Sequence, residues 1–220
     1  MNKKQTPTLE AGQRVKVFFD ANPDTVGVFV TAQQRAELDA HVAALQSFDA
    51  EQLEMTVGAK AETMRMKAIR AEIHSDFINP ISDAARILSA NAPELKRLIL
   101  PSRIRRTGDF EGKAAAFAND LETYGDALRG RSTAAGEVAQ LRDLLAQFAE
   151  SKSTRARKQG RAKGATEGIK LADRALRSHI IVMDGTLTPR LRKNPPLLAN
   201  WKTTRHIQKT VVSPRRGGSL

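Results

Sequence analysis

Apolar residues recur every three or four positions along two long stretches of this sequence, and this spacing most restricts the fold. Side chains at that interval lie on one face of an α-helix, whereas a half-buried strand alternates apolar and polar residues. Thr31 precedes the first stretch and Ser132 or Thr133 the second, and these residue types cap helix N-termini. The pattern predicts an all-α helical bundle built on two long interrupted helices, about 31–90 and 133–183, with shorter packing helices. The apolar faces consist of Leu38, Val42, Leu45, Phe48, Met66, Ile69, Ile73, Phe77, Ile81, Ala84 and Leu88 in the first helix, and of Val138, Leu141, Leu145, Phe148, Ile169, Ala172, Leu176, Ile180 and Met183 in the second.

The residues that decide whether these helices are continuous are Gly58, Pro80, Gly160 and Gly164. Glycine costs about 1 kcal/mol relative to alanine inside a helix, so a break near Gly58 is the alternative to one unbroken first helix. Proline lacks a backbone N–H, so Pro80 should kink the helix or begin a new one. In the second helix, residues 152–166 offer no large apolar side chain on the continuing face. That helix therefore either crosses open solvent there or breaks near its two glycines.

Shorter segments complete the predicted bundle. Residues 94–100 are expected to form a short helix before a proline, and an alanine-rich helix is expected over 109–129, closed by a glycine. We expect residues 1–206 to form a single helical bundle domain and residues 207–220 to form a basic flexible tail.

The only tryptophan, Trp201, follows Leu197 and Leu198 at helical spacing. A short C-terminal helix could therefore place this aromatic ring against the end of the bundle core. We interpret Trp201 as a clamp on the core rather than as a binding residue.

The net charge of +12 is unevenly distributed. Residues 1–150 carry 19 Lys and Arg against 21 Asp and Glu, whereas residues 151–220 carry 17 against 3. Such asymmetry is typical of proteins that contact nucleic acid or another polyanion, although a solvated helix face gives the same composition. Only one aromatic residue follows Phe148, so contact with nucleic acid should involve the phosphate backbone rather than stacked bases.

The candidate polyanion-binding residues lie in the basic stretch of the second long helix. They are Lys152, Arg155, Arg157, Lys158, Arg161, Lys163, Lys170, Arg174 and Arg177. The favoured hypothesis is a non-enzymatic helical protein that contacts a polyanion, most simply a nucleic-acid backbone, through its basic C-terminal third, to which Arg190, Arg192, Lys193 and Lys202 also belong. The alternative is a structural or interaction bundle, including a homo-oligomer, whose charge serves only solubility. A polyanion binder should present these cations on one exposed surface, whereas a scaffold should present an exposed apolar strip to a partner helix.

The sequence contains no motif that clearly predicts a catalytic or metal-binding site. Gly125–Ser132 has the spacing of a phosphate loop, but a helix rather than a strand precedes it, so we interpret it as a joint between helices. Glu37 and His41 lie one helical turn apart, and His179 has no carboxylate near it in sequence, which falls short of a di-metal motif. The chain contains no cysteine. We therefore expect no enzyme activity, no cofactor and no metal site.

No segment of the sequence predicts a membrane protein. The longest apolar runs, such as Ile180–Met183, fall far short of the about 20 residues that a membrane span needs. The first residues include two lysines but no apolar run behind them, so we expect no signal peptide and a cytoplasmic location.

Several segments together resemble a widespread family of uncharacterised bacterial all-helical proteins. They are Arg14–Asn22, Gly164-Ala165-Thr166, Asn194-Pro195-Pro196-Leu197-Leu198-Ala199-Asn200-Trp201 and Arg205-His206-Ile207. The resemblance covers most of the chain, and the Pro-x-Leu-Leu-Ala-x-Trp ending is its most specific part. It implies an all-α cytoplasmic bacterial protein and brings with it no established activity or functional residue.

Overall fold

The computed structural model describes residues 6–101, 107–128 and 135–207, and every regular element within them is helical. The predicted all-α class is therefore confirmed. The chain divides into two compact units: unit 1 comprises Met1–Thr56 and Gly160–Leu220, and unit 2 comprises Val57–Gln159. The grouping of residues 1–206 into one domain stays a prediction.

Two long helices contribute residues to both units, α3 (Ala32–Glu72) and α6 (Ala135–Arg190). Neither is broken at its glycines: α3 continues through Gly58, and α6 continues through Gly160 and Gly164. The predicted end of the second helix at residue 183 is too early, because the buried face continues with Leu187 in the last turns of α6. The residues proposed as its N-cap lie outside the described part of the chain.

The start of α3 is closed by a reciprocal pair of hydrogen bonds. The backbone N–H of Gln34 donates to Oγ1 of Thr31 at 3.1 Å, and the backbone N–H of Thr31 donates to Oε1 of Gln34 at 3.0 Å. This capping box satisfies backbone donors that have no partner within the helix. The predicted cap at Thr31 is confirmed.

Pro80 changes the helix type instead of ending the helical path. After α3, residues Ile73–Ile78 form one stretch of π-helix (η1), and α4 (Asn79–Leu88) begins directly behind it with Pro80 in its first turn. The backbone N–H of Asn79 reaches the carbonyl of His74, one residue further back than in an α-helix. The wider turn just ahead of the proline accommodates its missing N–H, so the predicted disturbance takes the form of a π segment.

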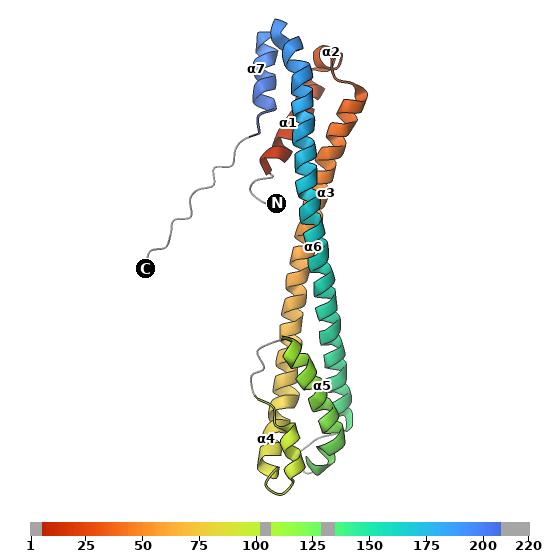
Figure 1. The fold of residues 1–220 in the computed structure, drawn as a ribbon, viewed down its shortest axis with the longest axis vertical. Coiled ribbons are helices and arrows are strands. Elements are labelled where there is room, and N and C mark those ends of the chain that lie inside the picture. The colour runs from red at the N-terminus through yellow and green to blue at the C-terminus, as the bar shows by residue number, and fades with distance from the viewer. Residues whose placement is uncertain (1–5, 102–106, 129–134, 208–220) are drawn as a thin grey trace, which may run out of the picture. The chain divides into compact units, whose positions relative to one another are not determined.

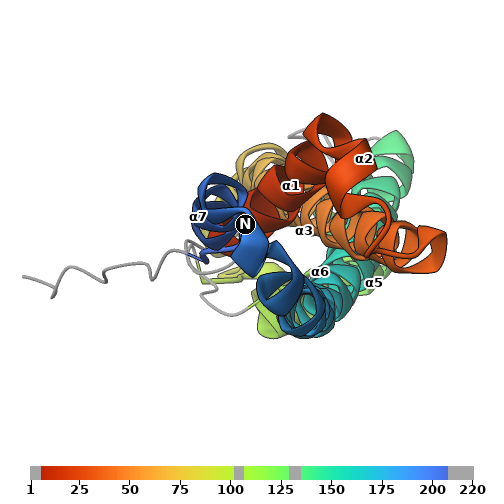
Figure 2. The same cartoon turned by 90° about the horizontal axis from the view of Figure 1, so that it is seen from above.

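Unit 1 is built around α1, which packs against α3, α6 and α7 (Figures 1 and 2). Its elements besides the long helices are α1 (Thr6–Ala21), α2 (Pro23–Val26), η4 (Leu191–Lys193) and α7 (Pro195–Thr204). Gly12 permits the close approach of three helices, because a Cβ atom there would lie 2.9 Å from Val42 on α3 and 3.0 Å from Leu176 on α6.

Trp201 closes the core of unit 1, as predicted. Its ring is fully buried, with centroids 5.4 Å from Phe18 and 6.0 Å from Phe19 of α1. Its Nε1–H donates to Oδ1 of Asp184 at 3.0 Å, and Nε of Arg205 lies 2.9 Å from the same oxygen. The polar edge of the indole is thus satisfied while its body fills the core.

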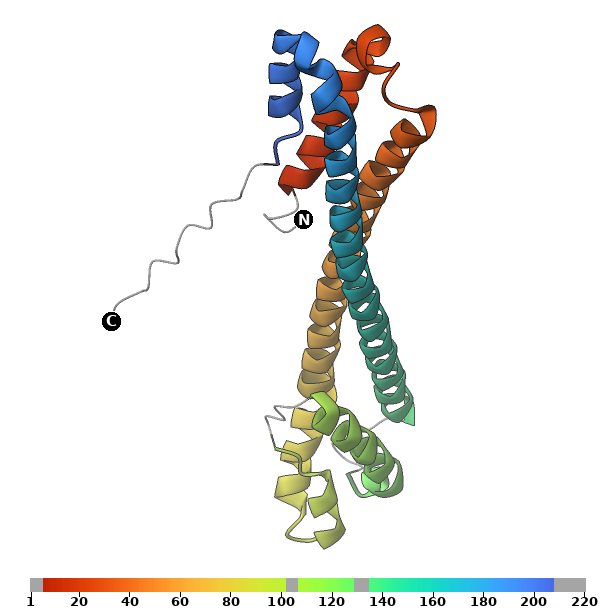
Figure 3. The same ribbon diagram turned by 45° about the horizontal axis from the view of Figure 1, so that its top comes forward.

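In unit 2 the C-terminal part of α3 continues into short helices, and α5 lies beside them (Figure 3). They are η1, α4, η2 (Pro93–Leu98), α5 (Thr107–Tyr124) and η3 (Gly125–Leu128). The short helix predicted over 94–100 is a 3₁₀ helix, and the helix predicted over 109–129 ends earlier, as α5 followed by the 3₁₀ turn η3. Of the phosphate-loop-like residues, 125–128 form that turn and the rest lie outside the described residues. Ser82 links α4 to the end of η2 and to the residues after it, because its hydroxyl donates to the carbonyl of Leu98 and accepts from the N–H of Leu100.

Candidate functional site

The nine candidate cations all lie on α6, but they are divided between the two units. Unit 2 holds Lys152, Arg155, Arg157 and Lys158, and unit 1 holds Arg161, Lys163, Lys170, Arg174 and Arg177.

In unit 2, two of the four cations are paired with carboxylates of neighbouring helices. Nζ of Lys158 donates to Oε1 of Glu62 on α3 at 2.9 Å, and Lys152 forms an ion pair with Glu111 on α5. The Lys158 hydrogen bond lowers the pKa of Glu62 below its usual 4.5, against the opposing effect of burial. Arg155 is half-buried, whereas Arg157 is exposed and donates to Thr154 within α6.

In unit 1, three of the five cations are paired. Nη2 and Nε of Arg161 both donate to Oε1 of Glu51 on α3, at 2.7 and 3.2 Å. Lys170 pairs with Glu167 at 2.7 Å and Arg177 with Asp173 at 2.9 Å, both along α6 itself. The remaining two, Lys163 and Arg174, are exposed and have no ion pair within the described residues. Much of the charge of the basic stretch is therefore compensated within the protein.

The stretch of α6 without large apolar residues does not cross open solvent where it lies in unit 1. Nε2 of Gln52 on α3 donates to Oγ1 of Thr166 at 2.7 Å, and Gly168 lies directly against the ring of Phe48. The Gln52–Thr166 hydrogen bond and the close approach at Gly168 thus take the place of large apolar side chains in the packing of α6 on α3.

A second group of cations in unit 1 lacks acidic partners among the described residues. Arg190, Arg192, Lys193 and Lys202 are exposed, and they lie at the end of α6, in η4 and in α7. The guanidinium of Arg190 lies 5.0 Å from the ring centroid of Phe29. These residues belong to the basic C-terminal third of the sequence, but they lie outside the nine candidate residues.

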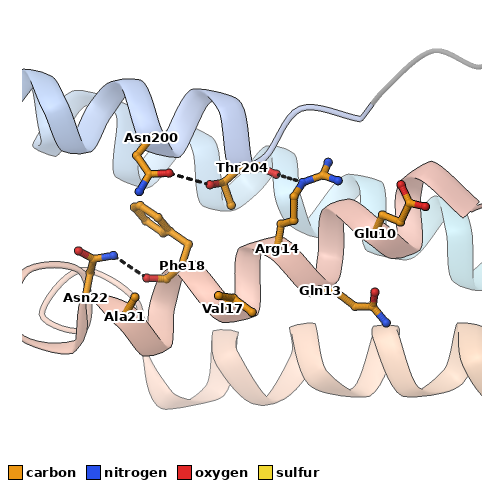
Figure 4. A pocket seen from close by; sticks show the side chains of 9 residues that line it. All are labelled: Glu10, Gln13, Arg14, Val17, Phe18, Ala21, Asn22, Asn200 and Thr204. Carbon is orange, nitrogen blue, oxygen red and sulfur yellow. Dashed lines mark hydrogen bonds between the residues drawn. The ribbon is translucent and has the colours of Figure 1, made fainter.

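An open groove of about 450 Å³ runs along α1 beside α7 (Figure 4). Its lining residues are Glu10, Gln13, Arg14, Val17, Phe18, Ala21, Asn22, Asn200 and Thr204. Two of the three guanidinium nitrogens of Arg14 are already engaged: Nη2 donates to the carbonyl of His206 at 2.7 Å, and Nε donates to the carbonyl of Thr204 at 3.3 Å. The groove offers amide and hydroxyl groups over an apolar floor, and it brings together no nucleophile with a general base.

One constellation that the sequence analysis missed surrounds His179, which is buried on α6. Its Nε2 lies 2.8 Å from the carbonyl oxygen of Gln34, its Nδ1 lies 3.6 Å from Oε2 of Glu37, and its ring centroid is 5.5 Å from that of His41. These partners come from α3, more than a hundred residues away in sequence, so no local spacing could have indicated them. Nowhere in the described residues do three or more metal-ligating side chains converge in a way that could hold a metal ion.

Large apolar side chains remain exposed on both long helices. On α3 in unit 2, Val57 and Met64 are 57% and 64% exposed. On α6 in unit 1, Leu171, Ile181 and Val182 are similarly exposed. Exposed apolar residues that repeat along one helix are typical of a surface that receives another helix.

Comparisons with protein-family models, with curated proteins and with solved structures find no match. The resemblance to the bacterial family named above therefore stays a prediction. None of the helices in the described residues combines the length and the apolar character needed to cross a membrane.

Proposed function

We propose that this chain is a non-enzymatic helical protein that acts by binding protein partners, which include further copies of itself, through exposed helix faces. The observation that carries this proposal is the exposure of Val57 and Met64 on α3, which lie seven residues apart and hence on one face of the helix. Burying side chains of this size against a partner is favourable by about 25 cal/mol per Å² of apolar surface. The ion pairs within the basic stretch support the same proposal, because they reduce the charge available to a polyanion.

Site-specific photocrosslinking in the producing cell tests this proposal. A photoreactive phenylalanine analogue replaces Met64 in unit 2 or Ile181 in unit 1, and the control carries it at Lys113, an exposed position on α5. We expect adducts of discrete mass from Met64 or Ile181 and none from Lys113. Equal labelling at all three positions, or no adduct at any of them, would refute the proposal.

Contact with a nucleic-acid backbone is the second candidate function, and the uncompensated cations Arg190, Arg192, Lys193 and Lys202 favour it. Phosphate contacts by such residues give an affinity that falls by about 0.9 log units per phosphate for each tenfold rise in salt. Within the basic C-terminal third, these four cations at the end of α6, in η4 and in α7 are better placed for such contact than the paired cations of the basic stretch.

Fluorescence anisotropy with labelled duplex DNA and with RNA, at several salt concentrations, tests this second candidate. One variant changes Arg190, Arg192, Lys193 and Lys202 to Glu, and another changes Arg155, Arg157, Arg161 and Lys163 to Glu. We expect the first variant to lose the salt-dependent binding and the second to retain most of it. Absence of binding by the unmodified protein at low salt would exclude the second candidate.

A further inference from the structure

The exposed face of α3 in unit 2 has the spacing of a coiled-coil seam. We call this face the α3 seam; it consists of Val57, Ala61, Met64, Ala68 and Ala71, all exposed. The steps between its members alternate between four and three residues, which is the heptad pattern that keeps one face of a helix against a partner. Val57 and Met64 supply the large side chains, and the alanines leave room for close approach.

Basic residues flank the α3 seam. Lys60, Arg65 and Lys67 are exposed beside it, and neither lysine has an ion pair within the described residues. Two copies of this segment facing each other would place like charges together, which is unfavourable. The seam therefore requires a partner helix with small core residues and acidic flanks.

The part of α3 in unit 1 presents such a face. Ala36, Ala40, Ala43 and Ser47 are all exposed there, at steps of four, three and four residues. The flanking residues Glu37 and Asp39 are acidic and exposed. Asp39 uses Oδ1 to pair with Lys16 at 2.8 Å, which leaves its second oxygen for another cation.

We infer that residues 57–71 of one copy of this chain pair antiparallel with residues 36–47 of a second copy. In this register Val57 lies opposite Ser47, Ala61 opposite Ala43, Met64 opposite Ala40, and Ala68 opposite Ala36. The same register places Lys67 beside Asp39 and Arg65 beside Glu37 on the two flanks of the seam. Large residues thus face small ones, and cations face anions on both sides.

Both segments belong to α3, so they can face each other only across two copies (Figure 1). This inference rests on the proposed function, because it takes the exposed face of α3 to be a protein-binding surface and names its partner.

Cysteine cross-linking tests the register directly, since the chain has no cysteine of its own. Purified Ala61→Cys protein is mixed with purified Ala43→Cys protein under mild oxidation. In the matched control, Ala61→Cys protein is mixed with Ala50→Cys protein, whose cysteine lies at an exposed position seven residues further along α3. We expect a mixed disulfide dimer from the first mixture and about tenfold less from the control, because the control thiols lie out of reach in this register. Equal cross-linking in both mixtures would overturn the register.

The charge and apolar contributions are tested by the mass of the purified protein in solution. We expect the unmodified chain to self-associate, and Met64→Asp or Lys67→Glu to weaken that association by about tenfold or more, whereas Lys113→Glu on α5 leaves it unchanged. Circular dichroism checks that each variant keeps its helical content. A chain that stays monomeric overturns the inference. If the chain is monomeric but photocrosslinking at Met64 captures a different protein, the proposed function holds and only the pairing of two copies fails. If photocrosslinking yields no adduct at Met64 or at Ile181, the proposed function and the pairing both fail.

Discussion

Nζ of Lys158 on α6 lies 2.9 Å from Oε1 of Glu62 on α3, and this ion pair links the two long helices within unit 2. The carboxylate is only 14% exposed, so it depends on the lysine for the interactions that water would otherwise provide. Lys158, which the sequence predicts to be part of a polyanion-binding stretch, thus holds two helices together. The same holds for Arg161 and Glu51 in unit 1.

The Glu62 ion pair makes the stability of unit 2 vary with pH in the acid range. The pKa of Glu62 is lowered from 4.5, chiefly by the hydrogen bond from Lys158, so the native protein binds this proton less readily than the unfolded chain does. The pair therefore stabilises the protein above pH 4.5, and this contribution is lost as the pH falls through the lowered pKa. We expect Glu62→Gln to flatten the pH dependence of urea unfolding in that range. Glu94→Gln, at an exposed position, serves as the control and should leave the acid limb unchanged.

The two glycines Gly164 and Gly168 of α6 should respond to alanine in opposite directions. A Cβ atom at Gly168 would lie 2.7 Å from the ring of Phe48, whereas one at Gly164 would meet nothing within 4 Å. We expect Gly164→Ala to stabilise unit 1 by about 0.5–1 kcal/mol and Gly168→Ala to destabilise it by about 1–3 kcal/mol. Thermal or urea unfolding measures both. Equal stabilisation by the two alanines would show that Phe48 moves aside without cost.

Removal of the Trp201 side chain should destabilise unit 1 severely. The ring is fully buried against Phe18 and Phe19, and its N–H bonds to Asp184. We expect Trp201→Ala to lower the free energy of unfolding by about 3–5 kcal/mol, because the missing ring leaves a large cavity in the core. The neighbouring exposed change Lys202→Ala should stay within about 0.5 kcal/mol of the unmodified protein. A small shift for Trp201→Ala in urea unfolding would contradict the clamp.

A second pH dependence is expected from His74 in unit 2. Burial, and then the nearby charge of Arg70, lower the pKa of this imidazole from 6.5; its ring lies 5.4 Å from that of Phe110. The native state therefore binds the His74 proton less readily than the unfolded chain does, so stability declines as the pH falls from 6.5 through the lowered pKa. We expect His74→Leu to reduce the loss of stability below pH 6.5, measured by urea unfolding at a series of pH values. The exposed His206→Gln should show the same decline as the unmodified protein.

Much of the fold could be predicted from the sequence because apolar periodicity reports which face of each helix is buried. Leu38, Val42 and Leu45 on α3 and Leu176, Ile180 and Met183 on α6 are buried as their spacing predicts. The cap at Thr31 was equally readable, since a capping box depends on residues three apart. The end of α6 is not predictable in the same way, because Gly185 and Pro189 are typical of helix termini, yet Leu187 keeps the buried face in phase.

The candidate site was less predictable, because the state of a charged residue depends on its neighbours in space. Lys152, Lys158 and Arg161 belong to one basic stretch in sequence, but their carboxylate partners come from α5 and α3. His179 likewise gained Glu37 and His41 only through the packing of α6 on α3. No spacing within the sequence encodes such long-range contacts.

The sequence by itself determined the all-α class, the buried faces of the two long helices and the burial of Trp201, because periodicity acts between residues a few positions apart. Tertiary structure alone decided which cations of α6 are neutralised, how the region from Thr166 to Gly168 is packed, and which apolar residues of α3 stay exposed. Each of these depends on what a second helix places opposite a side chain, and that is set by the packing of elements distant in sequence.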